Sequence, residues 1–204
     1  MVFLQGLMVG ASLIIPIGAQ NAFVLERGIR RNHAMLVATL CFFADAFLIA
    51  LGVGGAGKVI ASSPTLQWLL AVGGTAFLLV YGFRSFQRAW HFSATKLNEK
   101  GILTRAQVVT MTLAVTLLNP HVYLDTVMIQ GAVAGQYARA EQWLFAAGSI
   151  TASFLWFFGL SLLAGWCAPQ LRKPMVQRSI DGLVGILMWS VAIKLVLTTL
   201  GIAA

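Results

Sequence analysis

Six long apolar stretches follow one another along this chain of 204 residues, and each reaches about 20 residues. An α-helix of that length crosses the roughly 30 Å of hydrocarbon in a bilayer. Because 59% of the residues are hydrophobic and 10% are charged, the chain has too little polar surface for a soluble globule. The sequence predicts an all-α integral membrane protein, a single transmembrane domain over 1–204. The expected spans are 2–25, 34–57, 66–87, 108–133, 143–166 and 180–201.

Polar residues and prolines interrupt the first and fourth stretches near their middles. The first carries Pro16 and Gly18, and the fourth carries Pro120. Non-helical backbone at membrane depth is tolerated only where it is buried in protein or lines a cavity. Proline also suits the first position of a helix, so half-helices running on from Pro16 and Pro120 should point their positive N-terminal ends at the midplane. These breaks are typical of a transporter.

Dividing the chain between the third and fourth stretches gives two repeats, about 1–95 and 105–204. Each holds three spans, and an odd number means that the second repeat enters the membrane inverted. Aligning Pro16 with Pro120 places Asn21 against Asp125 without a gap. The sequence therefore favours two inverted three-helix repeats, although coincidence among apolar residues remains an alternative.

Lysine and arginine concentrate in alternate loops, and the side richer in them faces the cytoplasm. Both termini are accordingly predicted to lie outside the cytoplasm; if the N-terminal segment failed to cross, five spans and an internal N-terminus would result. The net charge of +8 does not indicate nucleic acid, because the basic residues form short clusters between apolar runs. The cations assigned to the cytoplasmic loops are Arg27, Arg30, Arg31, Arg84, Arg88, Lys96, Lys100, Arg105, Arg172, Lys173 and Arg178; Lys58 and Arg139 lie opposite.

Asp45 and Asp125 are charges that lipid should exclude: the first lies midway along the second stretch, the second one turn beyond the break in the fourth. A carboxylate at that depth costs at least a few kcal/mol, so it should face the bundle interior and have a partner. We expect that partner to be the cargo. A protonated structural aspartate and an internal salt bridge are the alternatives. Lys194 is the competing cation, although its long stem could simply snorkel to the interface.

Two carboxylates facing two helix N-termini suit a zwitterion with an extra positive charge, such as a basic amino acid. Proton coupling is assigned to Asp45 and Asp125, with His121 as a proton shuttle or a hydrogen-bonded core histidine. The expected substrate-binding residues are Asp45, Asp125, Asn21, Gln20, Asn119 and Tyr123.

Other polar residues carry no separate function in this interpretation. Asp181 is expected to complement the N-terminus of the last helix.

No catalytic residue, metal site or cofactor is expected, because no nucleophile lies with a base and no ligand cluster has helical spacing. A cation channel or a divalent-metal exporter stays open as a different class. Small residues, including Gly73 and Gly185, could pack within one chain or in a homo-oligomer.

The segments 16–25 and 118–126 resemble the signature segments of the LysE family of amino-acid exporters, and the resemblance covers essentially the whole chain. It is strongest to the lysine and arginine exporters, the arginine outward permeases, whose paired membrane aspartates match Asp45 and Asp125. The resemblance implies export from the cytoplasm across a bacterial inner membrane, by proton antiport with alternating access. The family also contains neutral amino-acid exporters, so the identity of the amino acid stays open.

Overall fold

The computed structural model describes residues 1–16, 18–56, 64–90, 103–171 and 174–199, and every element in these ranges is a helix. The predicted all-α class is confirmed. Each of the expected stretches coincides with a helix or with a broken run of helices. Several cations used in the orientation argument lie outside the described residues: Lys58, Lys96, Lys100, Arg172 and Lys173.

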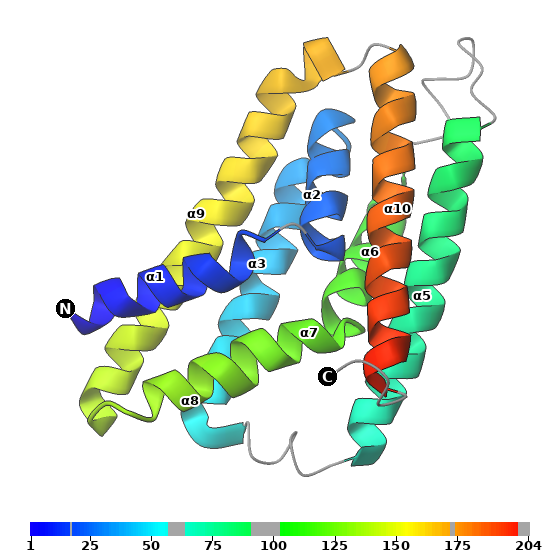
Figure 1. Cartoon of the computed structure of the whole chain (residues 1–204). Coiled ribbons are helices and arrows are strands. Elements are labelled where there is room, and N and C mark those ends of the chain that lie inside the picture. The colour runs from blue at the N-terminus through cyan, green and yellow to red at the C-terminus, as the bar shows by residue number, and fades with distance from the viewer. Residues whose placement is uncertain (17, 57–63, 91–102, 172–173, 200–204) are drawn as a thin grey trace.

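The first half of the chain begins with a broken pair of helices. Helix α1 (Val2–Ile14) and helix α2 (Ala19–Ile29) meet at a bend of 81°. Helix α3 (Ala34–Leu51) follows and continues as the π-helical turn η1 (Gly52–Ala56). Helix α5 (Pro64–Trp90) lies on the other side of α2 (Figure 1).

The second half repeats this order of elements. Helix α6 (Arg105–Leu117) ends at a break, after which a run of short helices lies across the bundle (Figure 1). Two long helices follow, and α10 lies beside α5. The remaining bounds are α7 (Pro120–Tyr123), the π-helical η3 (Leu124–Ile129), α8 (Gln130–Ala134), α9 (Arg139–Leu171) and α10 (Pro174–Thr199).

Two helical segments in the described part of the chain are long and apolar enough to cross a membrane, Ala34–Gly55 and Arg139–Pro169. The bent pair α1 and α2 adds a third if it counts as one span. Length and composition thus agree with a helical membrane protein.

The two breaks differ in how they start the next helix. Helix α7 begins at Pro120, as predicted. Helix α2 begins only at Ala19, with Gly18 as an extended N-cap, so the expectation that it runs on directly from Pro16 is wrong. Proline lacks the N–H that would continue α1, so Pro16 ends that helix, and the chain needs further residues to turn through the bend.

Asp181 does not complement a helix N-terminus, contrary to the prediction. Helix α10 begins at Pro174, so Asp181 lies about two turns inside it. Its carboxylate pairs with Arg30 at 2.9 Å and with Arg88 at 3.0 Å. These partners lie at the C-terminal end of α2 and on α5, and no spacing along the sequence indicates such a contact.

Helices α5 and α10 pack closely within this chain through reciprocal glycine contacts. A Cβ on Gly82 would lie 2.3 Å from the ring of Trp189, and one on Gly185 would lie 2.9 Å from the ring of Phe86. The two rings meet edge to face at 5.2 Å between centroids. Gly185, which the sequence left open between packing within one chain and between two, therefore has a packing partner in its own chain.

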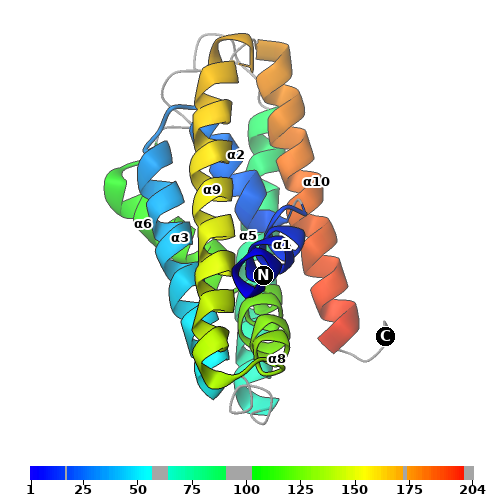
Figure 2. The ribbon, with the colours of Figure 1, turned by 90° about the vertical axis from the view of Figure 1, so that its left-hand side faces the viewer.

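Helix α1 crosses α9 at backbone contact (Figure 2), and glycines make this approach possible. A Cβ added to Gly6 would lie 2.0 Å from the carbonyl oxygen of Phe145. A Cβ added to Gly148 would lie 2.0 Å from the carbonyl oxygen of Phe3. Small residues at such crossings let helices approach in the way that membrane proteins favour. The crossing fixes the position of α1, and with it one side of the break.

We expect Gly148→Ala to destabilise the protein, because the new methyl group meets backbone that cannot rotate away. Overpacking of this kind costs about 1–3 kcal/mol or more. The matched control is Gly159→Ala on the same helix, where a Cβ meets no atom within 4 Å. Thermal unfolding of the purified variants in detergent should show a lower midpoint for Gly148→Ala alone. Equal midpoints for the two variants would contradict the close crossing.

Candidate functional site

A pocket of about 260 Å³ opens where the break between α1 and α2 faces α3, η3 and α10. It brings together most of the residues expected to bind substrate, but Tyr123 is not on its wall. The hydroxyl of Tyr123 instead donates to the carbonyl oxygen of Leu117 at 2.8 Å, across the second break. The lining residues are Leu13, Ile14, Pro16, Gly18, Ala19, Gln20, Asn21, Asp45, Asn119, His121, Val122, Asp125, Thr126, Phe157, Val191 and Lys194.

Both predicted aspartates line this pocket, near enough for their charges to interact. Asp45 on α3 is 2% exposed and accepts a hydrogen bond from Ser153 of α9 at 3.0 Å. Asp125 is only partly buried and lies in η3, where the π-helical backbone interrupts regular α-helix. Such π-helical turns occur often at functional sites.

The amide nitrogen of Gln20 is a buried donor beside Asp45. It lies close to the Asp45 carboxylate and the Cys41 sulfur, within reach of a hydrogen bond to either side chain. The same donor can serve a bound molecule in place of these side chains.

Lys194 and His121 stand on the wall of the same pocket. The Lys194 charge is near enough to interact with both Asp125 and His121. The pocket therefore contains the cation Lys194 beside Asp125, the more exposed of the two aspartates. Lys194 thus interacts with the site as well as having a stem long enough to reach the interface. A positively charged molecule entering the pocket would compete with Lys194 for Asp125.

Asn21 holds the first break together. Its amide nitrogen donates to the carbonyl oxygens of Ile14 at 2.7 Å and of Pro16 at 2.9 Å. Its amide oxygen accepts from the indole N–H of Trp156 at 3.1 Å. Both amide hydrogens are thus used to satisfy carbonyls that the bend leaves without helical partners. Asn21 lines the pocket, yet its donors serve the backbone.

The helices that start at the two breaks are capped differently. The side-chain oxygen of Asn119 accepts from the backbone N–H of His121 at 3.1 Å and so caps α7. The N-cap of α2 is Gly18, which has no side chain to offer. A Cβ on Gly18 would meet no atom within 4 Å, so the space beside this N-terminus is open. No side chain among the described residues caps α2, and the N-terminus of a helix favours binding of an anion.

Sequence reasoning missed the contribution of α9 to this site. Ser153 and Trp156 donate to the pocket residues Asp45 and Asn21, and Ser149, one turn earlier on the same face, donates to Gln130 outside the pocket. Their spacing of four and three residues is the helical repeat that places side chains on one stripe. Polar residues at this spacing in an otherwise apolar stretch were the signal that could have identified them.

Comparison with known proteins gives one family over nearly the whole chain. The LysE type translocator family matches residues 11–199. An arginine exporter protein ArgO of Salmonella schwarzengrund is 45% identical over 197 residues, which cover 95% of this chain and 92% of that protein. The ArgO protein of Klebsiella pneumoniae is 46% identical over 194 residues, with the same coverage of both chains. No solved structure matches.

We expect Asn21→Ala to destabilise the fold more than Trp156→Phe does. The first change leaves two carbonyls of the break without a donor, at about 1–3 kcal/mol each, and the second removes one hydrogen bond worth about 1 kcal/mol. Thermal unfolding in detergent measures both. Trp166→Phe is the control, because this exposed tryptophan lies on the same helix, away from the pocket. An Asn21→Ala midpoint equal to that of the control would refute the bracing role.

Proposed function

The chain belongs to the LysE family of translocators, and from that membership we propose that it exports basic amino acids, L-arginine in particular, out of the cytoplasm. The similar proteins named as arginine exporters support this choice of cargo. In this proposal the site binds the cargo and releases it without making or breaking covalent bonds.

The observation that carries the proposal is the distribution of charge around one pocket. Asp45 and Asp125 supply two carboxylates, and the uncapped N-terminus of α2 supplies backbone N–H groups with partial positive charge. Arginine carries one carboxylate and two cationic groups at neutral pH. Its carboxylate would bind at Gly18 and Ala19, while its ammonium and guanidinium groups would face the aspartates.

Export of a cation needs an energy source beyond diffusion. Moving one positive charge outward against an inside-negative potential costs about 2.3 kcal/mol per 100 mV. Exchange of one inward proton for one outward cation makes the cycle electroneutral. We assign this coupling to Asp45 and Asp125, with His121 beside them, because an aspartate can hold either a proton or the cargo but not both.

Alternating access would follow from rocking of two inverted repeats, about 1–95 and 105–204. The packing supports this division: α1 packs on α9, and α6, its counterpart, packs on α3. The breaks that follow α1 and α6 are also counterparts, and both contribute to the pocket. In this proposal, six spans cross the bacterial inner membrane, with both termini outside the cytoplasm.

Other cargoes are the main alternatives. A neutral amino acid carries a single cationic group, so it would engage one of the two aspartates and leave Asp125 to Lys194. For a divalent metal, the described residues offer no group of three or more His, Cys, Asp or Glu that could hold the ion. A cation channel would conduct without saturable exchange, so counterflow measurements separate it from a carrier.

We predict that Asp45→Asn and Asp125→Asn each lower arginine counterflow in proteoliposomes by about tenfold or more. Loss of a charged partner in a desolvated pair costs roughly 2–5 kcal/mol, and about 1.4 kcal/mol corresponds to a factor of ten. Glu141→Gln is the matched control, because this exposed acid on α9 lies away from the pocket. Lysine, canavanine and threonine tested in parallel define the cargo. Wild-type arginine counterflow in both aspartate variants would refute the site.

We also predict that an imposed pH gradient drives export. Proteoliposomes loaded with arginine and acidified on the side corresponding to the cell exterior should release it faster than vesicles without a gradient, because inward proton movement supplies the energy. The gradient should have little effect in the Asp125→Asn variant. Wild-type export that ignores the gradient would refute proton coupling while leaving the cargo assignment intact.

A further inference from the structure

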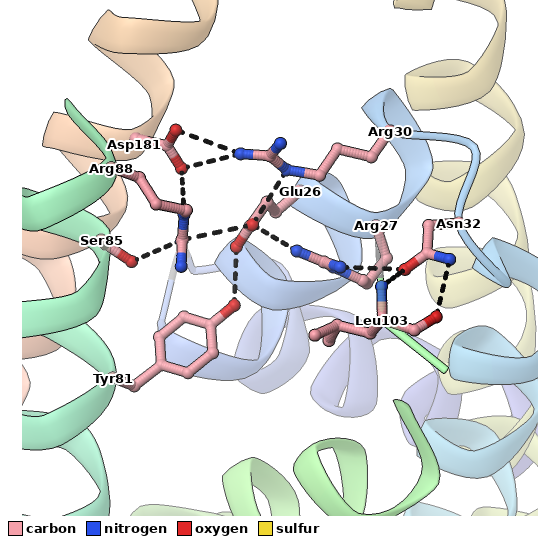
Figure 3. A network of polar contacts seen from close by, with 9 residues as sticks. All are labelled: Glu26, Arg27, Arg30, Asn32, Tyr81, Ser85, Arg88, Leu103 and Asp181. Atoms are coloured by element: carbon pink, nitrogen blue, oxygen red, sulfur yellow. Dashed lines mark hydrogen bonds and ion pairs between the residues drawn. The ribbon is translucent and has the colours of Figure 1, made fainter. Parts of the chain in front are cut away.

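The far end of α2 carries a buried set of charges that the pocket does not use, shown in Figure 3. Glu26 is 1% exposed and pairs with Arg27, with Arg30 at 3.1 Å and with Arg88 at 3.3 Å. Asp181, which lies on α10, pairs with Arg30 and with Arg88. We call Glu26, Arg27, Arg30, Arg88 and Asp181 the ionic cluster.

The hydroxyl of Tyr81 ties α5 further into the ionic cluster, because it donates to Glu26 at 2.6 Å. Arg27 donates to the side-chain oxygen of Asn32 at 3.0 Å. Asn32 in turn bonds the backbone N–H and carbonyl of Leu103, just before α6. The ionic cluster therefore joins α2 and α5 to α10 and to the segment leading into α6, which are elements of the two different repeats.

The ionic cluster and the pocket lie at opposite ends of one short helix. Gln20 of the pocket and Glu26 of the cluster are six residues apart, or about 9 Å along the helix axis. The cluster lies where α2 and α5 end and α10 begins, the end of the bundle that the arginine-rich loops predict to be cytoplasmic (Figure 1). Helices α7 and α8, which flank the partly exposed Asp125, lie toward the other end.

Charges are an unusual choice for holding helices together permanently. Replacing buried ion pairs by well-packed apolar residues is often neutral or stabilising. At a contact that must separate, ion pairs lower the free energy of opening, because water solvates the separated charges. Apolar side chains gain no such hydration when they separate. Rearranged interface salt bridges are a recurring device in proteins that switch between two packings.

We propose that the ionic cluster is the cytoplasmic gate of the transporter: its ion pairs close the path to the pocket in this structure and break when the cargo is admitted. The inference deepens the proposed function, since it names the contact that opens on the side from which the cargo comes. Both carboxylates share arginines, so loosening α10 from α5 also weakens the hold on α2. The gate is thus expected to open as one unit.

The test is chemical labelling of a pocket residue from the two sides of the membrane. Val191 on α10 lines the pocket, and Val191→Cys is the reporter, with Cys41 and Cys167 replaced by alanine. A membrane-impermeant maleimide is applied to the cytoplasmic face in inverted vesicles and to the outer face in spheroplasts. Arg88→Gln should increase the labelling rate at the cytoplasmic face roughly fivefold or more and lower it at the outer face, because the population shifts toward the open gate.

Arg84→Gln is the matched control. Arg84 lies one turn away on the same helix and is exposed, so the change of charge is identical outside the cluster. Asp181→Asn should change the labelling in the same direction, and the double variant should change it by less than the sum, because both changes remove the pair between Arg88 and Asp181. Labelling rates equal to those of Arg84→Gln would overturn the gate, as would increases at both faces, which indicate unfolding. Labelling requires no cargo, so the gate can be tested even if arginine proves not to be the cargo.

Discussion

The structure depends on one constraint: a helix that breaks inside an apolar bundle frees backbone groups, and each must find a partner. At the first break, Asn21 supplies donors to two carbonyls and Trp156 holds Asn21 in place. At the second, Asn119 caps the new helix and Tyr123 bonds the carbonyl of Leu117. No described side chain caps α2, so the N-terminus of this helix is the part of the break that can bind an anion in the pocket.

The same constraint explains why the residue type alone does not separate residues that bind the cargo from residues that stabilise the broken backbone. Asn21, Asn119 and Tyr123 are polar residues at a break, which is the pattern expected of substrate ligands. In the structure their hydrogen bonds go largely to backbone. Gln20 is different, since its buried amide nitrogen lies beside the Asp45 side chain and bonds no backbone carbonyl in the described residues. A binding residue is therefore distinguished by hydrogen-bonding groups that are not used by the backbone, and not by polarity alone.

Sequence alone predicted what depends on local rules. Asp45 and Asp125 stand out because charge is costly in an apolar run, and Pro120 marks a helix start because proline fits the first turn. The partners of Glu26 and Asp181 could not be predicted in this way. Arg30 and Asp181 are 151 positions apart, and arginines near the ends of apolar stretches look like ordinary loop cations. Only the packing of α2 against α5 and α10 shows that they are buried and paired.

Helix α2 gives a physical link between the pocket and the ionic cluster. It has only 11 residues, with its N-terminus at the pocket and the ion pairs at its other end, so in the proposed gating it would move as a rigid body. A ligand can shift the gate only if it binds one arrangement better than the other. Cargo whose carboxylate is held by Gly18 and Ala19 and whose cationic groups are held by α3 and η3 meets that condition, because rotation of α2 changes the distance between the two sets of partners. A molecule lacking either charge would bind without biasing the gate.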